Sequence, residues 1–421
     1  MVGLAVAAVL AASCASGPTS RSARQVPAGV KLIGAAHAHS ATSAALLRAA
    51  GHGEEAFAVA LYQQLAAGAG NFAIAPSSIA TVLAMVAAGA RGETAHQIVD
   101  ALGVQVPAGD LSRAIGGLAQ SFAQRTGPGV TLDEVDQAWL GQGRTVLASY
   151  ADTLAGPFGA PLATIDFADP AAAAAAINSW FDDHTDGNIT QLLDASDLTG
   201  HVALVLTDAV YLHAQWAYGF DPALTAPAPF HRANGGVENV PTMHLDGTLI
   251  HRGPGLGYAA GPGWKAVALP YRGDQLEMDV IVPDDLATFE TSLGTELATI
   301  VGAVRPAHVV LSMPKFDSNT ETDLVPALEH LGIDDVFEPT VADLSGIDGH
   351  DDLYVSDVKH EVVVHVDEQG TVAAAATGGI VVPEEAPVAT VVQVDAPFVY
   401  LVRDRATGAI LFLGRVTDPR A

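Results

Sequence analysis

The chain has a single cysteine and few basic residues. Cys14 has no second cysteine to pair with, so an intrachain disulfide is excluded, and no Cys/His group has the spacing of a zinc site. Only 19 Lys and Arg stand against 47 Asp and Glu, which gives a formal net charge of −28. Because the bases are scattered, we expect neither a nucleic-acid-binding surface nor a polyanion cofactor. We also expect no metal and no other cofactor. Packing of the 49% hydrophobic residues must stabilise the fold.

The apolar run at residues 1–13 is too short to cross a bilayer as a mature helix. It has the length of a secretory signal, and Ala11, Ala12 and Ser13 before Cys14 resemble a bacterial lipobox, although a basic segment in front is missing. We therefore expect an exported protein that is either secreted or held by a lipid anchor on Cys14 at the outer face of a bacterial membrane. Residues 15–50 are rich in Ala, Ser, Gly and Pro without periodicity, which predicts a flexible tether.

Residues 51–421 have the patterns of one continuous domain with mixed helices and strands. Apolar spacing predicts a helix over Glu54–Ala66, and Pro76 ends a short strand and is followed by a helix that Ser77 or Ser78 would cap. Further segments are typical of central strands over 130–140 and 202–211 and of a helix over 170–185. The pattern predicts an α+β fold.

The stretch from Glu368 to Pro387 is the most informative part of the chain. It separates two runs rich in β-branched residues, 362–367 and 388–394. A loop of about twenty residues in a compact domain is usually functional or disordered. From Thr371 to Gly379 no residue is charged or larger than Val, so this segment is small enough to enter a packed sheet. We interpret it as a strand held in reserve.

This stretch resembles the hinge and reactive loop of the serpin family. The matching hinge residues are Glu368, Gly370, Thr371, Ala373, Ala374, Ala375 and Ala376. Similar matches occur in order over residues 51–419, and many ordered motifs are more specific than one; they include residues 71–102, 178–181, 185–189, 204–212 and 267–271. The resemblance implies a large central mixed sheet, two further sheets, about eight to nine helices and an exposed reactive loop.

The resemblance also implies a function: a monomeric suicide inhibitor of serine proteases that is not itself an enzyme. A protease would form an acyl-enzyme with the loop, and the cleaved loop would then insert between two central strands of a five-stranded sheet. The small, uncharged hinge favours this function over the alternative, a non-inhibitory binding protein of the same fold.

The bond offered to the protease follows from the family's loop length. The seventeenth residue counted from Glu368 is Glu384, which predicts cleavage between Glu384 and Glu385 by a protease that accepts Glu. Cleavage by an elastase-like protease after Val381 stays open. Cleavage after Val388 also stays open if the loop is counted from its carboxyl end, where it is longer than is usual in the family.

By the same resemblance, Ser78, Asp208 and His360 form a cluster beneath the central strands, called the shutter, and Trp216 lies at the breach where insertion begins. A Ser/His/Asp set also occurs in hydrolases, but none of the three lies in a Gly-x-Ser-x-Gly motif. We therefore expect a charge-assisted contact between His360 and Asp208 that makes opening of the sheet sensitive to pH.

Overall fold

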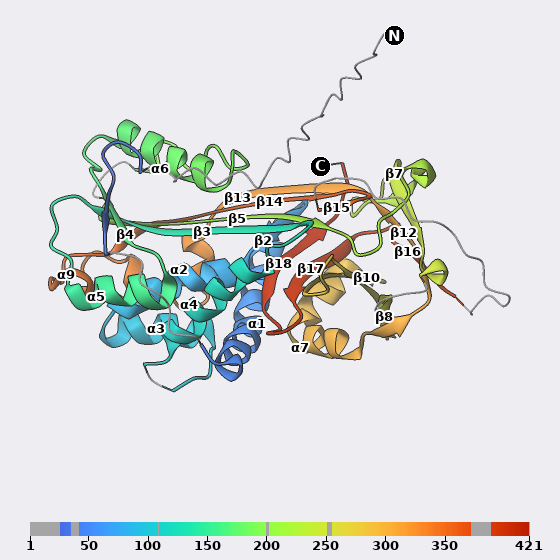
Figure 1. Ribbon diagram of the computed structural model, residues 1–421, viewed down its shortest axis with the longest axis horizontal. Coiled ribbons are helices and arrows are strands. Elements are labelled where there is room, and N and C mark those ends of the chain that lie inside the picture. Colours follow the sequence, from blue (N-terminus) through green and yellow to red (C-terminus); the bar gives the residue numbers. More distant parts are fainter. Residues whose placement is uncertain are drawn as a thin grey trace, which may run out of the picture.

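The computed structural model describes residues 26–34, 42–107, 109–198, 202–250, 255–371 and 389–420. Within these ranges the chain forms nine α-helices and three β-sheets, which confirms the predicted α+β architecture. Figure 1 shows the longest strands lying side by side, with one helix above them and most of the other helices below. No helix in the described ranges is both long and apolar enough to cross a membrane.

The largest sheet has seven strands and mixed directions. Five of them are the expected ones, and the expectation of five strands needs correction because a two-residue strand enters the middle and a three-residue strand joins the edge. In spatial order the strands are β1 (Lys31–Ile33), β4 (Leu162–Ile165), β3 (Val130–Gly141), β5 (Leu204–Gln215), β15 (Gly370–Thr371), β14 (Val355–Val366) and β13 (Phe316–Asp323).

Two further sheets complete the β structure. One has seven strands in the order β11 (Arg305–Ala307), β8 (Leu256–Gly261), β9 (Trp264–Pro270), β10 (Leu276–Pro283), β17 (Phe398–Asp404), β18 (Ile410–Val416) and β2 (Phe72–Ile74). The other has four strands in the order β16 (Thr390–Gln393), β12 (Val309–Pro314), β7 (Val237–Asp246) and β6 (Ala226–His231).

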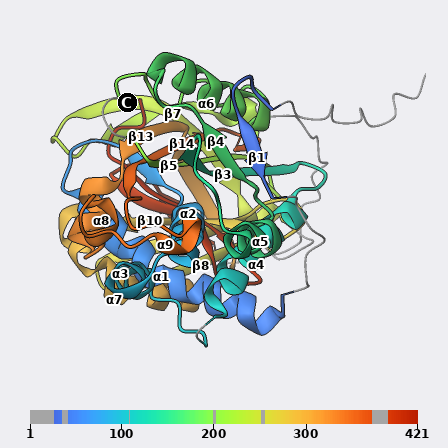
Figure 2. The same cartoon turned by 90° about the vertical axis from the view of Figure 1, so that its left-hand side faces the viewer.

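The helices divide the hydrophobic residues into two cores, one on each face of the large sheet. Of the described helices, α6 covers one face of the sheet (Figures 1 and 2). Its Trp180 is buried edge-on against Trp139 of β3. Helix α2 lies under the other face in the larger core. The helices are α1 (Ala44–Ala66), α2 (Pro76–Gly89), α3 (Gly92–Leu102), α4 (Leu111–Phe122), α5 (Ala148–Thr153), α6 (Pro170–His184), α7 (Leu286–Ala303), α8 (Val325–His330) and α9 (Ser345–Asp348).

Two segments correct the flexible tether expected over residues 15–50. Strand β1 pairs antiparallel with β4, and Val30 just before it is buried in the smaller core. Helix α1 begins at Ala44 rather than near residue 54, because the Ser43 side chain accepts a hydrogen bond from Leu46 N and caps the helix. Local capping and edge pairing thus order parts of a segment whose composition predicts a tether.

The start of α2 also differs from the prediction. Pro76 occupies the first turn and Ala75 the capping position, so neither Ser77 nor Ser78 caps the helix. Proline suits the first turn because its missing N–H would have no partner there. Both serine hydroxyls are therefore free to bond elsewhere, Ser77 to Glu54 and Ser78 to Asp136.

Candidate functional site

The large sheet divides at one end, and the first residues of the loop occupy the gap. Strands β5 and β14 pair directly in parallel from the Leu204/Val355 pair to the Tyr211/Val363 pair. Beyond that point β15 lies between them, with Thr371 paired to Ala214 on one side and Val366 on the other. The structure thus contains a short inserted strand at the position where the sequence resemblance predicts insertion of a longer one.

Four contacts hold the turn that leads into β15. The Glu368 carboxylate binds Lys315 Nζ at 2.8 Å and accepts a hydrogen bond from Thr225 Oγ1 at 2.7 Å. Burial opposes ionisation of this carboxyl, but the bonds from Lys315 and Thr225 outweigh it and lower the pKa of Glu368. On the backbone, Phe220 N donates to Glu368 O at 2.8 Å and Trp216 N donates to Gln369 O at 2.9 Å. The hinge is therefore anchored before the loop begins.

The side chains of Trp216 and Tyr271 lie beneath the point where the hinge enters the sheet. Their rings stack with centroids 4.6 Å apart, and Trp216 Nε1 donates to Asp367 O at 3.0 Å. Thr371 is 1% exposed, and its hydroxyl lies 2.9 Å from Tyr271 Oη. Sequence reasoning proposed Trp216 for this place but missed Tyr271, because nothing local indicates that the end of β9 lies beneath the hinge.

Gly370 has a backbone conformation and surroundings that fit only glycine. Its φ is +151°, and a Cβ at this position would lie 2.0 Å from Ala214 O. No other residue type allows β15 to approach β5 so closely. The glycine of the sequence motif therefore has a direct steric role.

Deeper in the sheet, polar side chains form a row across three strands above α2. Asp136 of β3 is the register partner of Asp208 of β5, which is in turn the partner of His360 of β14. Asp208 Oδ1 bonds to His360 Nδ1, as expected, and both residues are fully buried. Ser78 is the exception: it bonds to Asp136 rather than to Asp208 or His360.

The hydrogen bonds of His360 fix its protonation state. The backbone N–H of Ala75 points at Nε2 at 3.1 Å, so Nε2 accepts and carries no proton. The proton then sits on Nδ1 and is donated to Asp208, and the imidazole is neutral. A proton on Nε2 would break the bond from Ala75, and the expected pH sensitivity of the His360–Asp208 contact stays a prediction.

Sequence reasoning missed two members of this row, Glu134 and Asp136. They are two residues apart on β3 and point to the same face, as do Leu132 and Ala138 of the larger core on either side of them. The available signal was the pair of acids at alternate positions in a segment predicted to be a central strand. Two acids on the face of a central strand that packs on the core are unusual enough to mark a candidate site.

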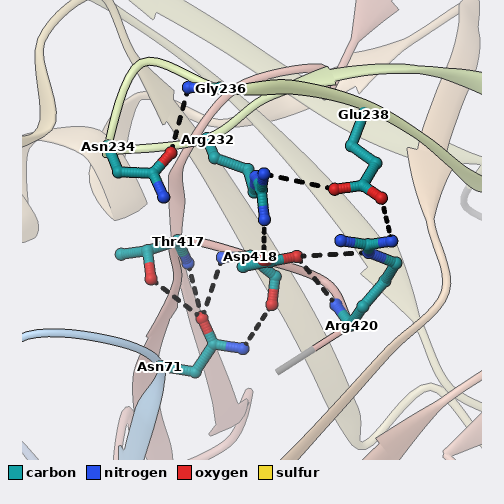
Figure 3. Close-up of polar contacts among 8 residues, drawn as sticks. All are labelled: Asn71, Arg232, Asn234, Gly236, Glu238, Thr417, Asp418 and Arg420. Carbon is teal, nitrogen blue, oxygen red and sulfur yellow. Dashed lines mark hydrogen bonds and ion pairs between the residues drawn. The ribbon is translucent and has the colours of Figure 1, made fainter.

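The other end of the loop returns beside a network of charges at the C-terminus. Strand β16 follows the loop, and Asp395 O just after it accepts from His231 N of β6 at 2.7 Å. Figure 3 shows Arg232 at the tip of the β6/β7 hairpin bonded to Glu238 and Asp418, with Arg420 beside both acids. Asn71 holds the same C-terminal segment through the Thr417 and Asp418 backbones. The β6/β7 hairpin, which lies on the other side of β12 from β16, is thereby fixed to the segment that follows β18.

Several predicted site residues lie outside the described residues. These are Cys14, the loop positions Ala373, Ala374, Ala375 and Ala376, and the predicted scissile pair Glu384 and Glu385. Among the residues that are described, no cluster of three His, Cys, Asp or Glu side chains has a geometry that could hold a metal ion.

Comparisons with known proteins agree with this geometry. The model of the serpin family, described as serine protease inhibitor, matches residues 52–419. Iripin-8 of Ixodes ricinus is 34% identical over 363 residues, covering 82% of this chain and 87% of that protein. Leukocyte elastase inhibitor of Bos taurus is 33% identical over 370 residues, covering 83% and 94%.

A solved structure leads to the same family. Serpin48 of the insect Tenebrio molitor, described as a highly specific serpin, superposes with a TM-score of 0.76 at 27% identity, covering 89% of this chain and 98% of that one. The chain therefore belongs to the serpin family, whose members are in general serine protease inhibitors and not enzymes.

Proposed function

We propose that this serpin is an exported, monomeric suicide inhibitor that traps a serine protease by inserting its cleaved loop into the large sheet. The observation that carries the proposal is β15, which already lies between β5 and β14 with register partners on both. Beyond β15 the segment from residue 372 to 382 has no charge and no proline, so nothing in its composition prevents the short strand from growing.

The energetics of the proposed reaction follow from this geometry. The protease serine attacks the loop and forms an acyl-enzyme, and cleavage frees the hinge side of the loop. Each residue added to β15 gains ladder hydrogen bonds with β5 and β14, so a metastable native state relaxes downhill. The protease, still esterified to the inserted strand, moves with it. Inhibition succeeds when insertion is faster than hydrolysis of the ester.

The scissile bond, the target protease and the location of the inhibitor are inferred from the sequence. We place the scissile bond between Glu384 and Glu385, with a Glu-accepting protease as target, and elastase-like cleavage after Val381 or Val388 as the alternative. The N-terminal pattern supports export and lipidation of Cys14, which would hold the inhibitor at the outer face of a bacterial membrane.

Incubation with a Glu-specific protease and, separately, an elastase-like protease tests the function. We expect a covalent complex that survives denaturing gel electrophoresis and a released peptide that begins at Glu385 by mass spectrometry. A clean cut without complex, and without a gain in thermal stability, would instead support a non-inhibitory binding protein of the same fold. A peptide beginning at residue 382 or 389 would move the scissile bond to Val381 or Val388.

A further inference from the structure

The acidic row under the sheet has more carboxyl groups than its hydrogen bonds can satisfy. Glu134 and Asp136 bond to each other and to Ser78, and Asp136 faces Asp208 across the strands. Among the described residues, Glu134 Oε1 and Asp208 Oδ2 are buried without a hydrogen-bond partner. Three ionised carboxylates would place three negative charges side by side, at the fully buried Asp208 and at the half-buried Glu134 and Asp136. This is costly unless protons are retained.

The Glu134/Asp136 pair is the place where such a proton is held. Burial and the charge of Asp208 raise the pKa of Glu134 to about 8, although its hydrogen bonds with Asp136 and Ser78 act in the opposite direction, and burial and the neighbouring carboxylates raise the pKa of Asp136. Two carboxyls that share a hydrogen bond need at least one proton between them, as in other close carboxylate pairs. Near neutral pH the closed sheet therefore keeps a proton on this pair.

The pair lines a cavity that is large enough to hold water. A cavity of about 360 Å³ lies between β3, α2, α4 and α6, and both Glu134 and Asp136 line it. His184 of α6 is the other titratable side chain on its wall, while α2 and α4 contribute only hydroxyl, amide and apolar groups there. A proton released by the pair can reach water through this cavity without crossing the core.

Insertion must disturb this row, because it occurs at the boundary that the row crosses. A strand growing from β15 separates β5 from β14 and breaks the contact between Asp208 and His360. The half of the sheet that carries β3 and β5 must then shift over α2, from which Ser78 holds Asp136. We infer that opening of the sheet releases a proton from the Glu134/Asp136 pair into the cavity, so that strand insertion is controlled by pH. This inference rests on the proposed function.

A rise in pH favours opening of the sheet if the closed state binds the proton more tightly than the open state. The groups that face the pair are Asp208 of β5, His360 of β14, His184 of α6 on the cavity wall and, at longer range, Glu54 of α1. Asp208 and Glu54 are acids, and Nε2 of His360 accepts from Ala75 N, so none of these three buried groups supplies a positive charge in the closed state. The closed state therefore binds the proton more tightly than an opened, hydrated row does. Since opening releases a proton, a rise in pH from about 5 to about 8 favours it, and the effect levels off above the pKa of Glu134.

Annealing of a synthetic peptide tests this without any protease. The peptide has the sequence of residues 371–382 and is acetylated at its N-terminus; it would occupy the site of the growing strand in the full-length protein. We expect the annealing rate, followed by the gain in thermal stability and by native mass spectrometry, to rise at least about tenfold from pH 6 to pH 8.5, which corresponds to one pK unit of linkage. The Glu134→Gln variant should show less than about a third of that change.

Glu361→Gln is the matched control. Burial and the charge of Glu321 raise the pKa of Glu361 to about 7, but it neighbours His360 on β14 and points to the opposite face. It should keep the pH dependence of the unmodified protein. If Glu134→Gln folds poorly, Asp136→Asn replaces it, with the same loss of pH dependence expected.

The results distinguish a failure of pH control from a failure of strand insertion. A rate that does not change with pH, or an unaltered pH profile in Glu134→Gln, would overturn the inference while leaving strand insertion intact. Flattening of the profile by Glu361→Gln would also overturn it. Absence of annealing at every pH would refute strand insertion itself, and this inference with it.

Discussion

At the scale of single residues, Gly370 shows how closely the hinge is fitted to the sheet. A methyl group at this position would collide with Ala214 O, and alanine would have to adopt a φ of +151°, which is strained for any residue but glycine. We expect Gly370→Ala to lower the free energy of unfolding by about 1–3 kcal/mol, the usual cost of such strain, measured by urea denaturation.

Gly127→Ala is the control for this prediction. A Cβ at Gly127 would have no neighbour within 4 Å. Its effect should stay within about 0.5 kcal/mol, as for most surface substitutions. Equal effects of the two variants would contradict the steric role assigned to Gly370.

Thr371 is the residue on which growth of the inserted strand depends. It is buried against Tyr271, and its side chain has no room for a charged group. We expect Thr371→Arg to leave the fold intact but slow insertion, so that the protease cleaves the loop and escapes. Covalent complex on denaturing gels should fall at least about tenfold, equivalent to about 1.4 kcal/mol in the barrier.

Thr371→Ser retains the hydroxyl that meets Tyr271 Oη and should form complex as the unmodified protein does. Undiminished complex formation by Thr371→Arg would show that the hinge tolerates a charge, and the role given to this position would have to be abandoned.

At the scale of elements, the β6/β7 hairpin depends on the charge network in Figure 3. Arg232 joins the hairpin to Asp418 at 3.0 Å and to Glu238 at 3.2 Å. We expect Arg232→Ala to speed hydrogen exchange of the β6 and β7 amides, because the hairpin then loses the Arg232–Asp418 pair and keeps the Glu238–Arg420 pair with the C-terminal segment. Salt should produce a weaker form of the same change, since these charges are partly exposed.

Arg113→Ala removes a comparable surface pair, with Asp110 at the start of α4, far from the hairpin in sequence. It should leave exchange in β6 and β7 unchanged. The assignment fails if the two variants have the same effect on the hairpin.

At the scale of the whole molecule, buried carboxyls set the pH dependence of stability. Burial raises the pKa of Glu54 to about 8, that of Glu277 to about 7 and that of Asp357 to about 6. The native state thus binds more protons than the unfolded chain above the ordinary pKa of these groups. This stability is fully present below about pH 4.5 and is lost as the pH rises to about 8.

The growing negative charge of a chain that carries −28 acts in the same direction. We therefore expect the midpoint of urea denaturation to fall steadily when measured at pH 5, 6.5 and 8. A midpoint highest at pH 8 would show that the buried carboxyls are ionised in the native state after all.

The sequence by itself determined the α+β class, the order of most elements and the hinge motif of Glu368, Gly370 and Thr371. These features depend on local patterns: apolar spacing, β-branched runs and residues small enough for a sheet. Tertiary structure alone decided that β1 joins the edge of the sheet, that Ser78 bonds Asp136, and that Tyr271 lies under the hinge. Those contacts join residues far apart in the chain, and only packing sets them.

The protonation of the shutter shows the same division most clearly. The sequence predicted His360 beside Asp208, and the two are in contact. It did not reveal that Ala75 N–H holds the imidazole neutral, or that Glu134 and Asp136 lie next to Asp208. Which carboxyl retains a proton depends on burial and on the charges around it, and both exist only once the strands have met over α2.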